Sequence, residues 1–209
     1  MFESGISQQT RSDLDPLSKL PELGQFYLAG GTAAALHLGH RISYDLDFFT
    51  PKPFSVAKMI KHLKVLGSLK IDDTSEGTIN GVFNKTKFSF FIYPYPLLEK
   101  STPYQNIGVC GQRDLMCMKM DAISSRGKRR DFVDLYMLAQ KHHGLQKAAE
   151  DFQKKYRKSQ FNFPHILKSL SYFDDAQTDP PLDMLKKLDW KTVEAYFQKQ
   201  VPGLLKVYL

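Results

Sequence analysis

The stretch "FYLAGGTAAALHLGHRISYDLDFF", Phe26 to Phe49, predicts a strand, a helix and a second strand in close succession. "QFYLA" is typical of a short buried strand. The run that begins at Thr32 has high helix propensity, and Gly39 is well placed to end that helix. Side chains alternate between the two faces of a strand, so both aspartates of "YDLDFF", Asp45 and Asp47, are expected on one face.

Two carboxylates on one face of an otherwise apolar strand suggest a metal site. At this spacing their Cβ atoms lie roughly 6–7 Å apart. Hard cations such as Mg²⁺ or Mn²⁺ prefer oxygen ligands, and a carboxylate pair can hold them against a triphosphate. Without a counter-ion, two anions among apolar neighbours would be costly. The alternative is that each aspartate pairs with a nearby arginine, such as Arg41.

The segment "AGGT" that precedes the aspartates suggests a phosphate site. It ends the first strand and begins the helix, whose N-terminus presents free N–H groups. Gly30 and Gly31 permit a close backbone approach, and Thr32 can add a hydroxyl donor. The sequence therefore predicts that Gly30, Gly31 and Thr32 bind the phosphates of a nucleotide.

A second group of polar residues occurs in "RDLMCMKMDAISSRGKRRDFVDLYML", Arg113 to Leu138. Lys119 has apolar helical neighbours, an arrangement that can direct its ammonium at a phosphate. A lysine whose stem merely lies along the surface is the alternative. The segment also concentrates positive charge beside two aspartates one helical turn apart: Arg126, Lys128, Arg129, Arg130, Asp131 and Asp134. These aspartates can also act structurally, by tethering Arg126 or Arg130.

Both segments, in this order and spacing, resemble the AbiEii/AbiGii-type nucleotidyltransferases of the polymerase-β-like superfamily, and the resemblance covers Phe26 to Leu145. It implies an α+β fold: a polymerase-β-like mixed sheet flanked by helices, followed by a C-terminal helical bundle. It also implies transfer of a nucleotide to a hydroxyl, a toxin-like role beside a cognate antitoxin, RNA or tRNA as the acceptor, and an acidic residue near the active centre at Asp131 or Asp134.

One position departs from the superfamily pattern. Members commonly carry a third carboxylate on a later strand, where it helps to bind metal and to accept the proton of the acceptor hydroxyl. In the corresponding strand, "KTKFSFFIY", Ser89 stands where an acid is expected, although Asp72 or Asp73 could substitute. Loss of this base would weaken activation of the hydroxyl while leaving nucleotide binding intact.

Charge and composition agree with a globular protein that binds a polyanion. The chain of 209 residues has a net charge of +7. Its first 50 residues contain three basic and six acidic side chains, so the remainder is strongly basic. Two cysteines are too few for a disulfide framework, and neither a signal peptide nor a run of about 18–20 apolar residues is present. We therefore expect a cytoplasmic protein without membrane association.

Periodicity predicts the rest of the architecture. Helices are expected over Asp13–Leu23, capped by Asp13, and over Phe54–Gly67. "SLKIDD", "GTINGVF" and "TKFSFFIY" are expected strands, the last two joined by a hairpin at "FNK". The proline-rich "YPYPLL" should leave the sheet, and the chain should be helical from Gln112 onward. We expect a sheet module at 1–110 and a helical bundle at 111–209 that completes the active-site cleft.

The leading hypothesis is a metal-dependent nucleotidyltransferase that uses a nucleoside triphosphate (NTP) and releases pyrophosphate. Its expected catalytic residues are Asp45, Asp47, Lys119, Asp131 and Asp134; Asp45 and Asp47 bind metal, and the nucleotide is held by Gly30, Gly31, Thr32, Lys119, Arg126 and Arg130. The alternative is a degenerate member of the fold that binds nucleotide or RNA without turnover, as Ser89 suggests. A third hypothesis is transfer to a small hydroxylated metabolite, which the positive charge disfavours.

Overall fold

A seven-stranded mixed sheet forms the centre of the computed structural model, which describes residues 1–142 and 144–208. The strand order is β3-β4-β5-β2-β1-β7-β6. β2 runs parallel to β5 and β1 parallel to β7, while the other neighbours are antiparallel. The strands are β1 (Tyr27–Leu28), β2 (Leu46–Thr50), β3 (Leu69–Ser75), β4 (Thr78–Phe83), β5 (Thr86–Ile92), β6 (Thr102–Tyr104) and β7 (Ile107–Val109).

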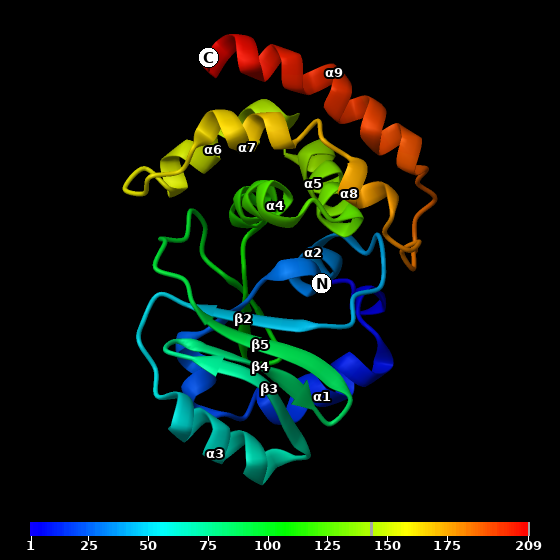
Figure 1. Cartoon of the computed structure of the whole chain (residues 1–209). Helices are drawn as coiled ribbons and strands as arrows, with labels where there is room; N and C mark the ends of the chain where they lie inside the picture. Colours follow the sequence, from blue (N-terminus) through cyan, green and yellow to red (C-terminus); the bar gives the residue numbers. More distant parts are fainter. Residues whose placement is uncertain (143, 209) are drawn as a thin grey trace.

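Helices cover both faces of this sheet (Figure 1). α1 and α3 pack on one face, and α2 lies on the other face together with the bundle α4–α9. The α-helices are α1 (Gln8–Leu17), α2 (Gly30–Leu38), α3 (Val56–Leu66), α4 (Gln112–Arg126), α5 (Arg129–Lys141), α6 (Gly144–Lys155), α7 (Phe163–Ser169), α8 (Asp174–Gln177) and α9 (Trp190–Tyr208). Two short 3₁₀ helices, η1 (Glu3–Gly5) and η2 (Pro21–Gln25), lie near the N-terminus.

The strand–helix–strand prediction for the first motif is confirmed as β1, α2 and β2. Helix α2 begins at Gly30, two residues before the predicted start, and Gly39 ends it with a φ of +56° that favours glycine. In β2 the residues alternate between buried and half-buried, with Asp47 on the half-buried face and Leu46 buried. Asp45 directly precedes this strand.

The predicted helix over Asp13–Leu23 is wrong in its position and its cap. α1 spans Gln8–Leu17, and the Ser7 side chain caps it by accepting a hydrogen bond from the backbone N–H of Thr10. Asp13 lies inside this helix, where its carboxylate accepts hydrogen bonds from the side chains of Thr86 and Asn84. A tertiary contact therefore explains the aspartate that the sequence had suggested as a cap.

The other predicted elements agree with the structure, with one omission. α3 and the three strands β3, β4 and β5 are confirmed, and the hairpin at Asn84 adopts a φ of +52°. The segment after β5 leaves the sheet, and the chain is helical from Gln112. The short hairpin of β6 and β7 was not predicted, because three-residue strands leave little periodic signal.

The sheet and the bundle share one apolar core, which extends from Ile6 at the N-terminus to Leu204 in α9. This shared core fixes the bundle over the sheet, so residues of α4 and α5 face those of β2 and β5. Among the helices that the structure describes, none is long and apolar enough to cross a membrane.

Candidate active site

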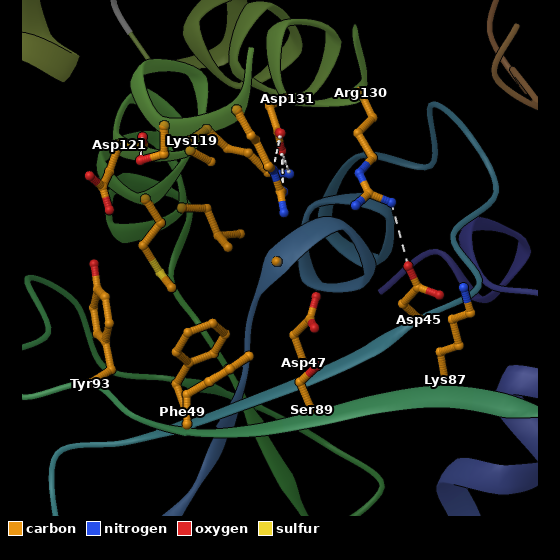
Figure 2. A pocket seen from close by; sticks show the side chains of 17 residues that line it. Asp45, Asp47, Phe49, Lys87, Ser89, Tyr93, Lys119, Asp121, Arg130 and Asp131 are labelled. Atoms are coloured by element: carbon orange, nitrogen blue, oxygen red, sulfur yellow. Dashed lines mark hydrogen bonds and ion pairs between the residues drawn. The ribbon is translucent and has the colours of Figure 1, made fainter. Parts of the chain in front are cut away.

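A cleft of about 540 Å³ lies between strands β2 and β5 and helices α4 and α5 (Figure 2). Both predicted motifs contribute to it, although they are far apart in the sequence. Its lining residues are Gly30, Asp45, Asp47, Phe49, Lys87, Ser89, Phe91, Tyr93, Leu115, Met118, Lys119, Asp121, Ala122, Ser125, Arg126, Arg130 and Asp131.

The floor of the cleft follows from the register of two parallel strands. Asp47 on β2 is paired with Ser89 on β5, and Phe49 is paired with Phe91. Because side chains alternate along each strand, these four point to the same face of the sheet. The sequence places two carboxylates, Asp45 and Asp47, at one part of this floor.

Asp47 occupies an environment that disfavours a free carboxylate. Burial raises its pKa, and the nearby Asp45 raises it further, while Lys119, Arg126 and Arg130 partly offset both effects. Within the described part of the chain, its side chain makes no hydrogen bond or ion pair. Such a carboxylate is suited to a cation that arrives with the substrate.

Asp45 has only a weak partner. Its Oδ2 lies 3.4 Å from Arg130 Nη1, and both side chains are substantially exposed. Arg41, the partner considered from the sequence, binds Asp134 instead. The alternative that each aspartate pairs with a nearby arginine is therefore wrong for Arg41 and for Asp47, although Asp45 keeps its weak contact with Arg130.

The two glycines make room for charged side chains. Gly30 lines the cleft with a φ of +63°, and a Cβ atom there would lie 2.4 Å from Asp47 Oδ2. A Cβ atom on Gly31 would lie 2.5 Å from an Arg41 guanidinium nitrogen. Ala29 gives helix α2 no side-chain cap, which leaves N–H groups of its first turn for another acceptor.

Thr32 is buried and does not line the cleft. Its hydroxyl donates a hydrogen bond to the backbone oxygen of Asp45 and lies 3.0 Å from Ser43 Oγ. The threonine thereby fixes the backbone of the first aspartate against the start of α2.

Lys119, Asp131 and Asp134 form a buried ionic network above the floor. Lys119 Nζ lies 2.8 Å from Asp131 Oδ1 and 2.6 Å from Asp134 Oδ2. Asp131 also accepts two hydrogen bonds from Arg126, at 2.8 and 3.0 Å. Asp134 is bound by both Nε and a terminal nitrogen of Arg41, at 2.7 and 2.9 Å.

These partners keep both aspartates ionised. Burial alone would raise the pKa of Asp131, but Lys119 and Arg126 outweigh it and hold the pKa below its usual value. For Asp134 burial is again opposed, here by Arg41 and Lys119, and the pKa lies well below its usual value. Asp131 therefore tethers Arg126, as considered from the sequence. Asp134 also tethers an arginine, but this is Arg41 and not Arg126 or Arg130.

The third carboxylate is not on the sheet floor beside Asp47, where Ser89 stands. Asp72 and Asp73 are exposed on β3, which is separated from β2 by the two strands β4 and β5, so the suggestion that they substitute is wrong. The cleft instead contains Asp121, on α4, which we did not single out from the sequence. Its position two residues after Lys119 gave no signal, because residues two apart on a helix do not lie on the same face.

Comparison with known proteins shows to which family this sequence is similar. The sequence model described as "Nucleotidyl transferase AbiEii toxin, Type IV TA system" matches residues 13–98 and 92–203. An uncharacterised protein of Aquifex aeolicus, aq_aa25, is 37% identical over 206 residues, which cover 96% of this chain and 98% of that protein.

Solved structures share the fold at low sequence identity. MenT4, a nucleotidyltransferase toxin from Mycobacterium tuberculosis H37Rv, is 14% identical, with a TM-score of 0.60 over 94% of this chain and 82% of its own. JHP933 from Helicobacter pylori is 16% identical, with a TM-score of 0.53 over 96% and 94%. At these identities the likeness establishes an α+β nucleotidyltransferase fold and no finer property.

Proposed function

Because the chain belongs to the AbiEii nucleotidyltransferase toxin family, we propose that its cleft transfers a nucleotide from an NTP to a hydroxyl of RNA, with tRNA a candidate acceptor. One observation carries the proposal. The half-buried Asp47 has a raised pKa and makes no hydrogen bond or ion pair within the described residues. It lines the same cleft as Asp45, Gly30 at the start of α2, and Lys119.

Asp45 and Asp47 would hold a divalent cation, Mg²⁺ or Mn²⁺. The described residues contain no group of three or more His, Cys, Asp or Glu side chains that could bind a metal ion. Two carboxylates leave coordination positions for substrate oxygens and water, as Mg²⁺ sites with phosphates commonly do. When bound, the cation would supply charge neutralisation at the reacting phosphate.

The remaining groups would position the triphosphate and neutralise its charge. The backbone N–H groups at Gly30, Gly31 and Thr32 are candidates to bind phosphate oxygens, because a helix N-terminus attracts anions. Arg126 and Arg130, both at the cleft, would bind further oxygens. Lys119 would stabilise the negative charge that develops at the α-phosphate.

Asp131 and Asp134 would act as positioning residues. Each is fully buried and bound to cations of the site, so neither has an oxygen free to take part in the transfer itself. They hold the ammonium of Lys119 and the guanidinium of Arg126 in fixed places. Preorganised charges of this kind need no rearrangement in the transition state.

In the proposed reaction the acceptor hydroxyl attacks the α-phosphorus and pyrophosphate leaves. Ser89, which is beside Asp47, cannot serve as a base at neutral pH, so the proton of the hydroxyl would pass to water. A serine at the position where an acid is expected also supports the second candidate, a degenerate protein that binds nucleotide or RNA without turnover. A cognate antitoxin protein is the partner that the family suggests.

Transfer can be tested directly with RNA as acceptor. Wild-type protein is incubated with total RNA, Mg²⁺ and each NTP labelled at the α-phosphate, and both labelled RNA and pyrophosphate are measured. We expect labelled RNA from the wild type and from the surface variant Asp15→Asn, and none from the Asp45→Asn, Asp47→Asn double variant or with a chelator. Label transfer by the double variant would overturn the proposal, and NTP binding without pyrophosphate release would favour the second candidate.

A further inference from the structure

The two ends of the cleft differ in chemistry. Every second side chain of a strand points to the same face, so the cleft is lined by alternate residues of the two strands. On β5 the residues that face the cleft run from Lys87 through Ser89 to Phe91, and Tyr93 follows directly after the strand. On the neighbouring chain segment Asp45 and Asp47 are followed by Phe49. The cleft is therefore charged at one end and aromatic at the other (Figure 2).

The aromatic end is a preformed apolar wall. The ring of Phe49 lies 5.4 Å from that of Phe91 and 5.3 Å from that of Tyr93, between ring centres. All three side chains are half-buried, so part of each ring faces the cleft. Met118 and Ala122, one turn apart on α4, line the opposite side. A flat ring can bind between these two surfaces.

Asp121 is the one acidic side chain at this aromatic end among the described residues that line the cleft. Figure 2 shows it pointing from α4 toward Tyr93, away from Asp45 and Arg130. Its negative charge contributes to raising the pKa of Tyr93, which agrees with this proximity. The Tyr93 hydroxyl is hydrogen-bonded to the hydroxyl of Tyr156.

The Asp121 carboxylate has no partner in the described part of the chain, where it makes no hydrogen bond or ion pair. It is half-buried, and burial raises its pKa. A partly desolvated acceptor without a donor gains free energy when a ligand supplies one. Asp131 and Asp45 differ, because Asp131 is bound to the buried Lys119 and Asp45 lies beside Arg130. Asp47 also makes no hydrogen bond or ion pair within the described residues, but it lies on the floor beside Asp45 and not at the aromatic end.

We propose that the aromatic end binds the base of the NTP and that Asp121 accepts a hydrogen bond from an amino group of that base. This inference rests on the proposed function, because it needs the triphosphate at Asp45 and Asp47. The triphosphate would then lie at the charged end and the base at the aromatic end, with the ribose between them. The cleft would prefer a base that presents an amino group over its counterpart with an oxo group, since a carboxylate cannot donate to a carbonyl.

The experiment compares nucleotides that differ by one amino group. Binding of CTP and UTP, ATP and ITP, and GTP and ITP is measured by calorimetric titration with Mg²⁺, which needs no acceptor and no turnover. For at least one pair we expect the wild type to bind the amino-bearing nucleotide tighter by on the order of tenfold to a hundredfold.

Two variants identify the carboxylate as the cause. Asp121→Asn keeps the shape but can donate a hydrogen bond to an oxo group, so the preference should shrink to less than about threefold or reverse. Asp15→Asn makes the same chemical change on an exposed residue of α1 and should keep the wild-type preference. Thermal unfolding of each variant shows whether the fold is retained.

The outcomes separate this inference from the function on which it rests. If the wild type binds all five nucleotides alike, or if Asp121→Asn keeps the wild-type preference, the base assignment is wrong while the nucleotide site stands. If the wild type binds none of them, the proposed function itself fails, and the base assignment with it.

Discussion

At the scale of one residue, Asp47 occupies a position that costs the free protein stability and that suits the proposed site. Its carboxylate is held beside a second carboxylate, and Gly30 is needed to make room for it. The same raised pKa makes the residue receptive to a cation, so its cost in the free protein and its proposed use have one origin.

Replacing Asp47 by asparagine should therefore stabilise the free protein at neutral pH while impairing binding. Because the folded-state pKa is raised, the protonated form is favoured in the folded state, and this advantage is lost as pH rises through the folded pKa. Asp47→Asn removes that penalty, so its midpoint of thermal unfolding should exceed that of the wild type at pH 7. Affinity for Mg²⁺ with NTP should fall by at least about tenfold. A variant less stable than the wild type at pH 7 would contradict this account of Asp47.

Gly30→Ala should disturb the site where Gly203→Ala does not. A Cβ atom at Gly30 would collide with the Asp47 carboxylate and strain a positive φ, at a cost of about 1–2 kcal/mol or more in the free energy of unfolding. Gly203, inside helix α9, has no atom within 4 Å of an added Cβ. Its replacement should stabilise by roughly 0.5–1 kcal/mol. Urea denaturation measures both, and equal effects would mean that Gly30 has no special role.

The chemistry of single residues could be predicted from the sequence only where it is local. Asp45, Asp47 and Lys119 were expected from their local motifs, and all three line the cleft. The hydroxyl of Thr32 was expected to face a phosphate, but it binds a backbone oxygen thirteen residues later. Asp121 was missed because its significance lies in the residues across the cleft, which no spacing rule connects to it.

At the scale of elements, Asp134 joins helix α5 to the connection between α2 and β2. It accepts hydrogen bonds from Arg41 and His40, which follow α2, and lies against Lys119 of α4. All of these side chains are nearly or completely buried. One carboxylate therefore fixes both halves of the cleft relative to each other.

Asp134→Asn should destabilise the protein by about 3–5 kcal/mol, because it leaves buried cations without their counter-charge. Because the pKa of Asp134 is lowered in the folded state, its contribution to the free energy of unfolding depends on pH. Its stabilising effect is present above the usual pKa of an aspartate and is lost as pH falls through the folded-state value. Chemical denaturation from pH 7 down to pH 3 should show a smaller difference between wild type and variant at the acid end. A difference below about 1 kcal/mol at pH 7 would contradict the network.

Elements with a strong apolar period were predicted correctly, and those set by tertiary contacts were not. α3 and α4 have such a period or a long helical run. The start of α1 depends on the Ser7 cap, and the hairpin of β6 and β7 depends on pairing with β1. The pairing of β7 with β1 joins residues far apart in sequence, so local propensity could not reveal it. The Ser7 cap is local, and it was missed because the cap was expected at Asp13 instead.

At the scale of the whole molecule, the distribution of charge favours a polyanionic acceptor. The net charge is +7, although the first 50 residues contain twice as many acidic as basic side chains. The carboxylates of the site thus lie within an otherwise basic protein. Such a field would attract RNA, and the acidic centre would retain the cation of the proposed site.

RNA binding should consequently weaken as salt rises. The logarithm of the association constant for RNA should fall linearly with the logarithm of salt concentration, because bound counter-ions are released. Filter binding between 50 and 300 mM KCl measures the slope, and the Asp45→Asn, Asp47→Asn double variant should keep it. Salt-insensitive transfer to a neutral hydroxylated metabolite would instead favour a small-molecule acceptor.

The central claim is that Asp45 and Asp47 form a metal-dependent nucleotide site, and calorimetric titration of each NTP tests it most directly. The account predicts that the wild type binds at least one NTP in the presence of Mg²⁺. It also predicts that binding is lost on chelation and in the Asp45→Asn, Asp47→Asn double variant. Undiminished binding by that variant, or no binding by the wild type, would contradict the claim.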